Sequence, residues 1–322
     1  MTVGVTAPLA AIGATSVKTF TSFEFAMAKV KAVSGAAGDQ FAALENQAKK
    51  LGAQTMFTAS EVSTLQLSLS RLGFDPEQIQ SSTGQILALA QATDSGLGQA
   101  ADVVGSTLRA FGQDIENAGH LSDVMAASFS GSALSMDSFA NAMQYVAPVS
   151  KAAGVSIEET TAMLAVLANN GIRGSKAGRA LRRILGEMAA TGLPAGEALK
   201  KLGAQGLTLK DAFDEVGRSA QTQLLILAEN ADQLPELTRQ FKESDGAAAQ
   251  MAATMGDTTH GSIKRMASAV EGAQIALGTA LAPAVEKIAG LMTNLAARFT
   301  ALTPATQGAI AGLGAVVGAT GP

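Results

Sequence analysis

Residues 154–185 read GVSIEETTAMLAVLANNGIRGSKAGRALRRIL, and this stretch predicts two helices joined by a tight turn. Ser156 and Glu159 have the Ser-x-x-Glu spacing of a capping box, in which two side chains satisfy free backbone N–H groups at a helix start. The apolar run that follows leads into Asn170 and Gly171, residue types that tolerate the left-handed backbone conformation closing many helices. The stretch is therefore typical of a helical hairpin.

Small residues mark the second helix of this hairpin. Gly174 and Gly178 lie about one turn apart, and their lack of a side chain predicts that the second helix approaches the first closely. Leu181, Ile184 and Leu185 have the spacing of an apolar helix face. We expect the structural motif of the hairpin to consist of Gly171, Ile172, Gly174, Ser175, Ala177 and Gly178.

The composition predicts an all-α fold. The chain has 322 residues, enough for one large or two modest domains, but only 4% of them are aromatic. Alanine and glycine are abundant instead, and few runs alternate apolar and polar residues as a half-buried strand does. We therefore expect closely packed helices and almost no sheet.

The same composition excludes several classes of site. The chain has no Cys, so it has no disulfide, thiolate zinc site or cysteine nucleophile. The two histidines, His120 and His260, lack a second histidine at ligand spacing, and we interpret both as ordinary surface residues. Glu158 and Glu159 are adjacent, so their side chains diverge around a helix, and capping explains them better than acid–base catalysis. We predict no catalytic residue, no metal and no cofactor.

Two other classes fit poorly. The glycines of GIRGSKAGR do not match a phosphate-binding loop, because no strand precedes them and the Gly-Lys-Ser/Thr ending is missing. The formal net charge of -4 argues against a nonspecific nucleic-acid binder, which needs a basic surplus. Residues 1–10 lack the basic start and apolar centre of a secretory signal peptide.

Basic residues recur along the second helix of the hairpin, at Arg173, Lys176, Arg179, Arg182 and Arg183. The first four are three residues apart, so they lie on one broad helical face. A solvated helix face explains this pattern without any partner. The alternative is a binding face for an acidic protein surface or for DNA phosphates.

Capping pairs and glycine turns indicate that such hairpins repeat. The segments LSRLGF, LRAFGQ, SKAAGV and KKLGAQ each contain a glycine that is expected to end a helix. These glycines, Gly73, Gly112, Gly154 and Gly203, are 39, 42 and 49 residues apart, a spacing too variable for a strict solenoid. Helix starts are predicted by Thr58 with Glu61, by Asp75 with Pro76 and Gln78, and by Thr208 with Asp211. The expected parts are a lead helix at 1–22 that begins at about Pro8, a core region of helical hairpins at 23–206, a second helical group at 207–256, a long helical arm at 257–303 and an apolar, glycine-rich segment at 304–322.

The expected arm carries a heptad-like apolar seam. Its apolar residues recur every three or four positions, with one stutter beside Pro283, which should kink the helix or divide it in two. A helix of about 40 residues would be about 60 Å long. Such a seam needs partner helices, so we predict a homo-oligomer. The oligomer seam consists of Ile263, Met266, Val270, Leu277, Leu281, Val285, Ile288, Met292, Leu295 and Phe299.

The last segment has no charge after Arg298 and contains two Gly-x-x-x-Gly pairs, Gly308 with Gly312 and Gly314 with Gly318. This spacing lets apolar helices pack backbone to backbone in lipid or inside a seam, although the apolar portion is short for a full membrane span. Because the pattern is interrupted at Pro322, we expect the natural protein to continue beyond it.

Several of these motifs resemble a known family. The pattern Gly-Ile-x-Gly-Ser-x-Ala-Gly-x-Ala-Leu-Arg at 171–182 resembles the signature of the core region of phage tail tape measure proteins. Arg179 departs from that signature, which more often has Thr there, and we interpret it as a tolerated change on the helix surface. Further resemblances, covering most of the chain, are FEFAMAKVKAVSGA from Phe23, LGAQTMFTASEV from Leu51, LSRLGFDPEQI from Leu69 and ALGTALAPAVEKI from Ala276.

The resemblance implies a structural protein without catalysis. A family member is made in the host cytoplasm, occupies the tail lumen of the virion, sets tail length during assembly, and is expelled ahead of the DNA to help form a channel across the host envelope. Its implied partners are copies of itself, tail tube and tail tip or baseplate proteins, tail assembly chaperones and the host membrane, with transient DNA proximity but no specific nucleic-acid binding. Two alternatives remain open: a pore-forming or membrane-translocating helical protein outside a tail, and a muralytic enzyme.

Overall fold

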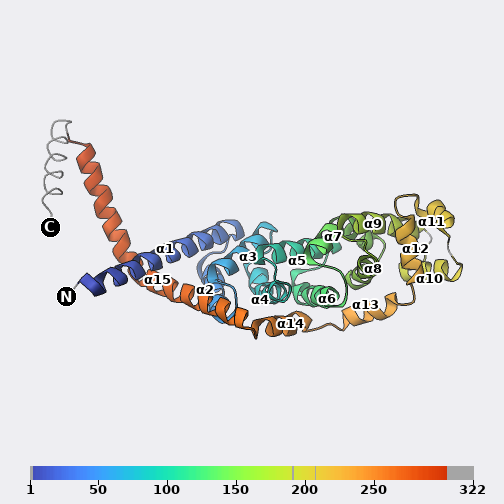
Figure 1. The fold of residues 1–322 in the computed structure, drawn as a ribbon. Helices are drawn as coiled ribbons and strands as arrows, with labels where there is room; N and C mark the ends of the chain where they lie inside the picture. Colours follow the sequence, from blue (N-terminus) through green and yellow to red (C-terminus); the bar gives the residue numbers. More distant parts are fainter. Residues whose placement is uncertain (1–2, 191, 207, 303–322) are drawn as a thin grey trace. The chain divides into compact units, whose positions relative to one another are not determined.

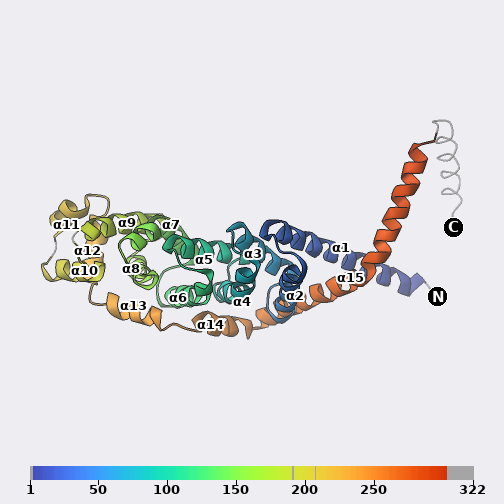
Figure 2. The same cartoon turned by 180° about the vertical axis from the view of Figure 1, so that it is seen from behind.

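The computed structural model describes residues 3–190, 192–206 and 208–302, and all regular elements in this part of the chain are helices (Figures 1 and 2). The all-α prediction is therefore confirmed. The chain divides into two compact units, one made of residues 1–22 with 273–322 and the other of residues 23–272.

Most helices belong to the larger unit, residues 23–272. Its first half contains α2 (Gly38–Gln54), α3 (Ala59–Arg71), α4 (Pro76–Thr93), α5 (Leu97–Phe111), the 3-10 helix η1 (Ile115–Asn117), α6 (Ala118–Gly131) and α7 (Met136–Ala152). Its second half contains α8 (Ile157–Asn169), α9 (Gly174–Ala190), α10 (Ala195–Ala204), α11 (Leu209–Val216), α12 (Gln221–Glu229), α13 (Leu234–Lys242) and α14 (Ala247–Gly256). Two long helices belong partly to each unit: α1 (Val3–Ser34) and α15 (Thr259–Thr300).

The core region is an array of hairpins in two layers. Helices α3, α5, α7 and α9 pack side by side in one layer, and α4, α6 and α8 form the second (Figure 1). Consecutive helices alternate between the layers, so each hairpin adds one helix to each of them. After α12 the chain turns back, and α13 and α14 pack along the outer side of the second layer (Figure 2).

The sequence determines where these hairpins begin and end. Thr58 and Asp75 each accept a hydrogen bond from the backbone three residues on and complete the predicted capping boxes with Glu61 and Gln78. At the other end of the helices, Gly73, Gly112 and Gly154 adopt the left-handed conformation, with φ of 80°, 68° and 69°. Their recurrence at the end of successive first-layer helices explains the irregular glycine spacing of the sequence.

Residues 193–206, the last part of the expected core region, contain helix α10. Ala195, Ala198 and Leu199 form a short apolar stripe that is buried, and α10 packs against α12. Gly203 permits this contact, because a Cβ at that position would clash with the carbonyl of Ala228 and lie 3.2 Å from its carbon. Glycine here serves close packing rather than flexibility.

The smaller unit pairs the start of α1 with the later part of α15. Gly278 lies against α1, because a Cβ there would be 2.5 Å from the carbonyl oxygen of Ser16 and would clash with Phe20. Beside this contact Thr19 donates a hydrogen bond to the Gln274 side chain at 2.8 Å. Successive contacts pair Gly13 with Leu281, Ser16 with Gly278 and Thr19 with Gln274, so the two helices are antiparallel.

The lead helix differs from the expectation in its extent, whereas α15 (Thr259–Thr300) lies within the expected arm of 257–303. The lead helix begins at Val3 rather than near Pro8 and continues to Ser34, so it includes Pro8, which has no N–H to donate to the helix. Pro283 lies inside α15, which remains one helix, so of the two outcomes expected at this proline, a kink or a division, the division does not occur. The ribbon of α15 bends in its C-terminal half (Figure 1).

Candidate functional site

The predicted hairpin of residues 154–185 is present as α8 and α9. Ser156 caps α8, with its hydroxyl accepting the backbone N–H of Glu159 at 3.2 Å. Glu159 does not complete the box, however. Its carboxylate accepts a hydrogen bond from the backbone of Gly196 at the start of α10, so it joins two helices instead of capping its own.

The turn of this hairpin uses the predicted residues. Helix α8 ends at Asn169, and Gly171 follows with a φ of 79°. The N–H of Ile172 bonds to the carbonyl of Leu167 at 2.9 Å, which is the six-residue closure of a Schellman motif. Gly174, with a φ of 60°, opens α9. Both glycines are therefore required by backbone conformation.

The close approach at Gly178 involves a different helix from the expected one. A Cβ at this position would clash with the carbonyl of Ala142 and lie 2.7 Å from its Cα, so α9 packs against α7 of its own layer. At the other motif glycine, Gly174, an added Cβ would lie 3.7 Å from the Cβ of Asn141, which is an ordinary contact. The pattern of small residues predicted a close contact correctly, but it placed that contact against α8, because sequence neighbours are the simplest partners to assume.

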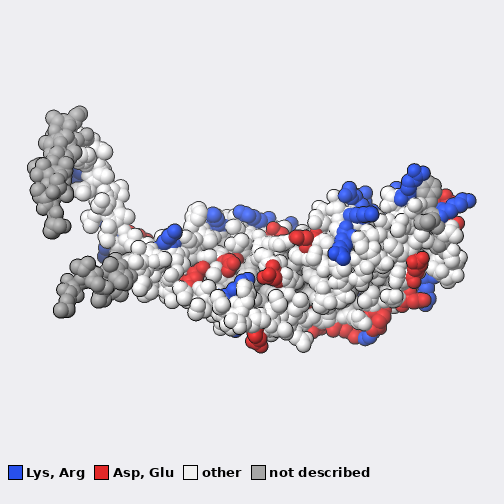
Figure 3. Space-filling model, in the orientation of Figure 1, with Lys and Arg blue, Asp and Glu red and all other residues white. Residues whose placement is uncertain are grey.

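The basic face of α9 consists of Arg173, Lys176, Arg179, Arg182 and Arg183, all exposed (Figure 3). The ring of Tyr145 lies 5.2 Å beneath the guanidinium of Arg179, whose Nε also donates to the carbonyl of Ser175 at 3.2 Å. The Nε of Arg173 donates to the carbonyl of Ala168 at 3.4 Å, near the end of α8. Within the described residues, the ion pairs do not include any of these five cations.

The oligomer seam lies on the exposed side of α15. The side chains of Ile288, Met292 and Leu295 are 61%, 61% and 63% exposed, and the remaining seam residues are exposed as well. The buried side of the helix consists mainly of small residues, namely Gly261, Ser268, Ile275 and Gly278. The apolar periodicity of the sequence thus identified exposed residues, while three of the four buried residues, all but Ile275, are too small to appear in such a pattern.

By length and composition alone, α15 is also long and apolar enough to cross a membrane, and it is the one such helix among the described residues. In its most apolar stretch of 18 residues, 11% is buried. The predicted packing glycines Gly308, Gly312, Gly314 and Gly318 lie outside the described residues.

His120 forms a polar cluster that the sequence did not reveal. Its Nε2 lies 2.8 Å from a carboxylate oxygen of Glu158, and its Nδ1 lies 3.4 Å from one of Asp245, so it connects α6, α8 and the turn before α14. Burial alone would lower the pKa of His120, but its hydrogen bonds to the carboxylates of Glu158 and Asp245, and their negative charges, outweigh it and raise the pKa. On the same helix, Asp123 accepts the N–H groups of Gly246 and Ala248 at 2.9 and 2.8 Å. His120 is therefore more than an ordinary surface residue.

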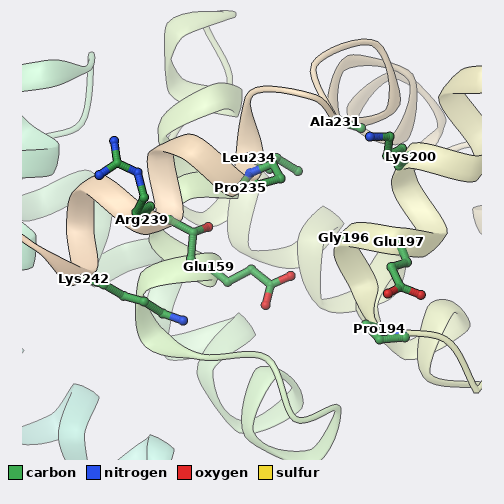
Figure 4. Close-up of a pocket in the computed structure, with 11 residues that line it drawn as sticks. Glu159, Pro194, Gly196, Glu197, Lys200, Ala231, Leu234, Pro235, Arg239 and Lys242 are labelled. Atoms are coloured by element: carbon green, nitrogen blue, oxygen red, sulfur yellow. The ribbon is translucent and has the colours of Figure 1, made fainter.

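A pocket of about 440 Å³ lies where α8, α10 and α13 meet (Figure 4). Glu159, Glu197, Lys200 and Lys242 contribute charges to its lining. Burial raises the pKa of Glu159, while the Gly196 hydrogen bond and the charge of Lys242 act in the opposite direction. Among the described residues no group of three or more His, Asp or Glu side chains is placed to hold a metal ion.

Comparison with known proteins agrees with the motif resemblance. The family model for the phage-related minor tail protein matches residues 45–243. A "Tape measure protein" of Pneumococcus phage Dp-1 is 30% identical over 350 aligned residues, which cover 100% of this chain and 30% of the relative. A "Probable tape measure protein" of Escherichia phage P2 is 31% identical over 313 residues, 86% of this chain and 38% of the relative. No solved structure matches the chain significantly.

The chain thus spans about a third of the length of these two relatives. The matched region includes the whole two-layered hairpin array with its α8–α9 motif. The chain therefore belongs to the phage-related minor tail protein family, the group of tail tape measure proteins that its motifs resemble.

Proposed function

We propose that the chain is the core part of a structural tape measure protein, which lies in the tail lumen of a phage or prophage virion, sets tail length during assembly and assists DNA delivery. The observation that carries this proposal is the similarity of the entire chain to a relative named as a tape measure protein. The names of both relatives favour this function over a pore-forming protein outside a tail and over a muralytic enzyme.

The test is deletion of the gene from its phage or prophage, followed by negative-stain electron microscopy of the lysate. We expect normal tails to be absent or to lose their uniform length, and we expect the intact gene supplied in trans to restore them. Tails of unchanged, uniform length in the deletion strain would rule out the proposal.

The exposed seam of α15 supports a second element of the proposed function, self-association. An exposed apolar stripe along a helix of 42 residues is stable in water only when other helices cover it. We infer that copies of the chain supply these helices inside the tail. Tail tube proteins, tail tip or baseplate proteins and assembly chaperones are further proposed partners.

After ejection the same helix is proposed to enter the host membrane, since its apolar stretch is long enough to span one. Flotation of the full chain with liposomes tests this role. Ile288→Asp adds a charge that costs roughly 2.5 to 3.5 kcal/mol at the centre of a spanning helix, so it should abolish flotation. Equal flotation of both proteins would exclude α15 as the membrane segment.

A further inference from the structure

Five cations of the larger unit lie together on α9 and the turn before it, in an otherwise acidic body. Residues 23–272 contain 20 Lys and Arg against 26 Asp and Glu. Between Glu159 and Glu187 the chain has five basic residues and no acidic one. The five basic residues are those of the α9 basic face, which therefore differs in charge from the rest of its unit.

Two other cations of the unit lie at the C-terminal ends of helices. The Lys151 side chain lies at the C-terminal end of α5, where a Cβ on Gly112 would be 2.9 Å from its Cε. Arg109 lies in the same way beside Gly73 at the end of α3, at 3.1 Å. The unsatisfied carbonyls at a helix C-terminus carry partial negative charge and stabilise such cations. Helix ends therefore account for these cations but not for most of the α9 basic face.

Two arginines of the α9 basic face, Arg173 and Arg179, are held in position before any partner arrives. The Nε atoms of Arg173 and Arg179 donate to backbone carbonyls, and Tyr145 supports the Arg179 guanidinium from below. The helix itself is fixed on α7 by the contact at Gly178. An arginine whose Nε is already bonded still offers its two terminal amino groups, and a rigid guanidinium pairs with a planar carboxylate through two parallel hydrogen bonds.

We propose that the α9 basic face binds an acidic segment of another protein, whose carboxylates pair with Lys176, Arg179 and Arg182. The face extends about 15 Å along the helix axis from residue 173 to residue 183, a length that an acidic helix covers with carboxylates on successive turns. A DNA-binding surface fits less well, because a duplex carries one negative charge per about 1.7 Å of its axis and would extend beyond the face over the acidic surroundings, whereas a short acidic segment needs to contact only the face. The inference does not depend on the tape measure function.

Binding of a fluorescent poly-L-glutamate peptide of about 12 residues to the full chain, followed by anisotropy, tests the proposal. The variant Lys176→Gln/Arg179→Gln/Arg182→Gln should bind the peptide at least about tenfold more weakly, a loss of about 1.4 kcal/mol. The matched control, Lys50→Gln/Lys201→Gln/Lys210→Gln, removes the same charge from exposed positions outside α9 and should change the affinity less than about twofold. Circular dichroism melting establishes that both variants fold.

A second variant separates the guanidinium geometry from charge alone. Arg179→Lys/Arg182→Lys keeps the charge but loses the planar forks and the support from Tyr145, so we expect a loss of about threefold or more. Full affinity in this variant, or in the glutamine variant, would overturn the proposal. Tighter binding of a DNA duplex than of the peptide, through the same residues, would also overturn it and identify a nucleic-acid surface.

Discussion

At Gly178 the main chains of α7 and α9 touch, so an added side chain must move backbone atoms rather than a flexible side chain. Gly178→Ala should therefore lower the free energy of unfolding by about 1 to 3 kcal/mol, the usual cost of overpacking. Urea unfolding followed by circular dichroism measures this change. The substitution tests whether the array needs a glycine at this crossing.

Gly186 is the matched control on the same helix, because a Cβ there would meet no atom within 4 Å. Gly186→Ala should leave stability unchanged or raise it by up to about 1 kcal/mol, as alanine is the better helix former. If the two alanine variants unfold at the same urea concentration, the α7–α9 crossing is not tight.

His120 gives the larger unit a dependence on pH. Its pKa is raised in the folded chain, so its stabilising contribution is complete below its ordinary pKa of about 6.5 and is lost as the pH rises through the folded value. Burial would raise the pKa of Glu158, but hydrogen bonds from Ser156, its own backbone and His120 lower it. The Glu158 contribution is present above its ordinary pKa and is lost as the pH falls through the folded value.

His120→Gln should therefore cost most near pH 5.5 and least near pH 8.5, with a difference of about 0.5 kcal/mol for a partly exposed group. Urea unfolding of the variant and the parent at both pH values measures this difference. His260→Gln serves as the control and should behave like the parent at both. A cost for His120→Gln that is equal at both pH values would show that the ion pairs do not contribute.

Single residues were predictable where the signal is local. Ser156, Thr58 and Asp75 bond to backbone a few positions away, and Gly171 is required by its own φ. Glu159 and His120 were misjudged because their partners come from distant segments, Gly196 and Asp245 respectively. No spacing rule in the sequence connects such residues before the fold brings them together.

Among the elements, α15 exposes an apolar seam along its length, and its few buried residues, mainly small ones, lie in its first half. If copies of the chain cover the outer face, the paired substitution Ile288→Asp/Leu295→Asp should convert an oligomer into a monomer, because burying two carboxylates in an apolar seam is costly. Sedimentation velocity over a range of concentrations measures this change.

The control for this experiment is Asn294→Asp/Thr293→Asp, which adds the same charge at exposed polar positions of the same helix. It should sediment like the parent. A parent chain that is monomeric at every concentration would contradict self-association through the seam.

Helix starts could be predicted from capping pairs, and helix faces from periodicity, because both depend on residues within a few turns. The helix against which each helix packs could not be predicted in this way. Alternation between two layers places α9 beside α7, with α8 between them in sequence, and only the assembled array specifies that neighbour.

At the scale of the whole molecule, tail length should depend on the length of the helical tape. Duplicating residues 259–300, the 42 residues of α15, within the phage gene should lengthen the tail by about 63 Å at 1.5 Å per residue. Electron microscopy of purified tails measures the change. Duplicating residues 97–131, which lie in the folded array, is the control and should add much less length. Equal lengthening by both insertions, or none by either, would contradict an extended α15 acting as the tape.

The hairpin array also has a consequence for the family's evolution. Each hairpin contributes one helix to each layer, and its first-layer helix ends at a left-handed glycine. If one hairpin were removed, its two neighbours in each layer could therefore pack against each other in the way that each now packs against the missing helix. Relatives of different length should therefore differ here by blocks of about 40 residues. Gaps in their alignments should begin and end at the turns that follow Gly73, Gly112 and Gly154 rather than inside the helices.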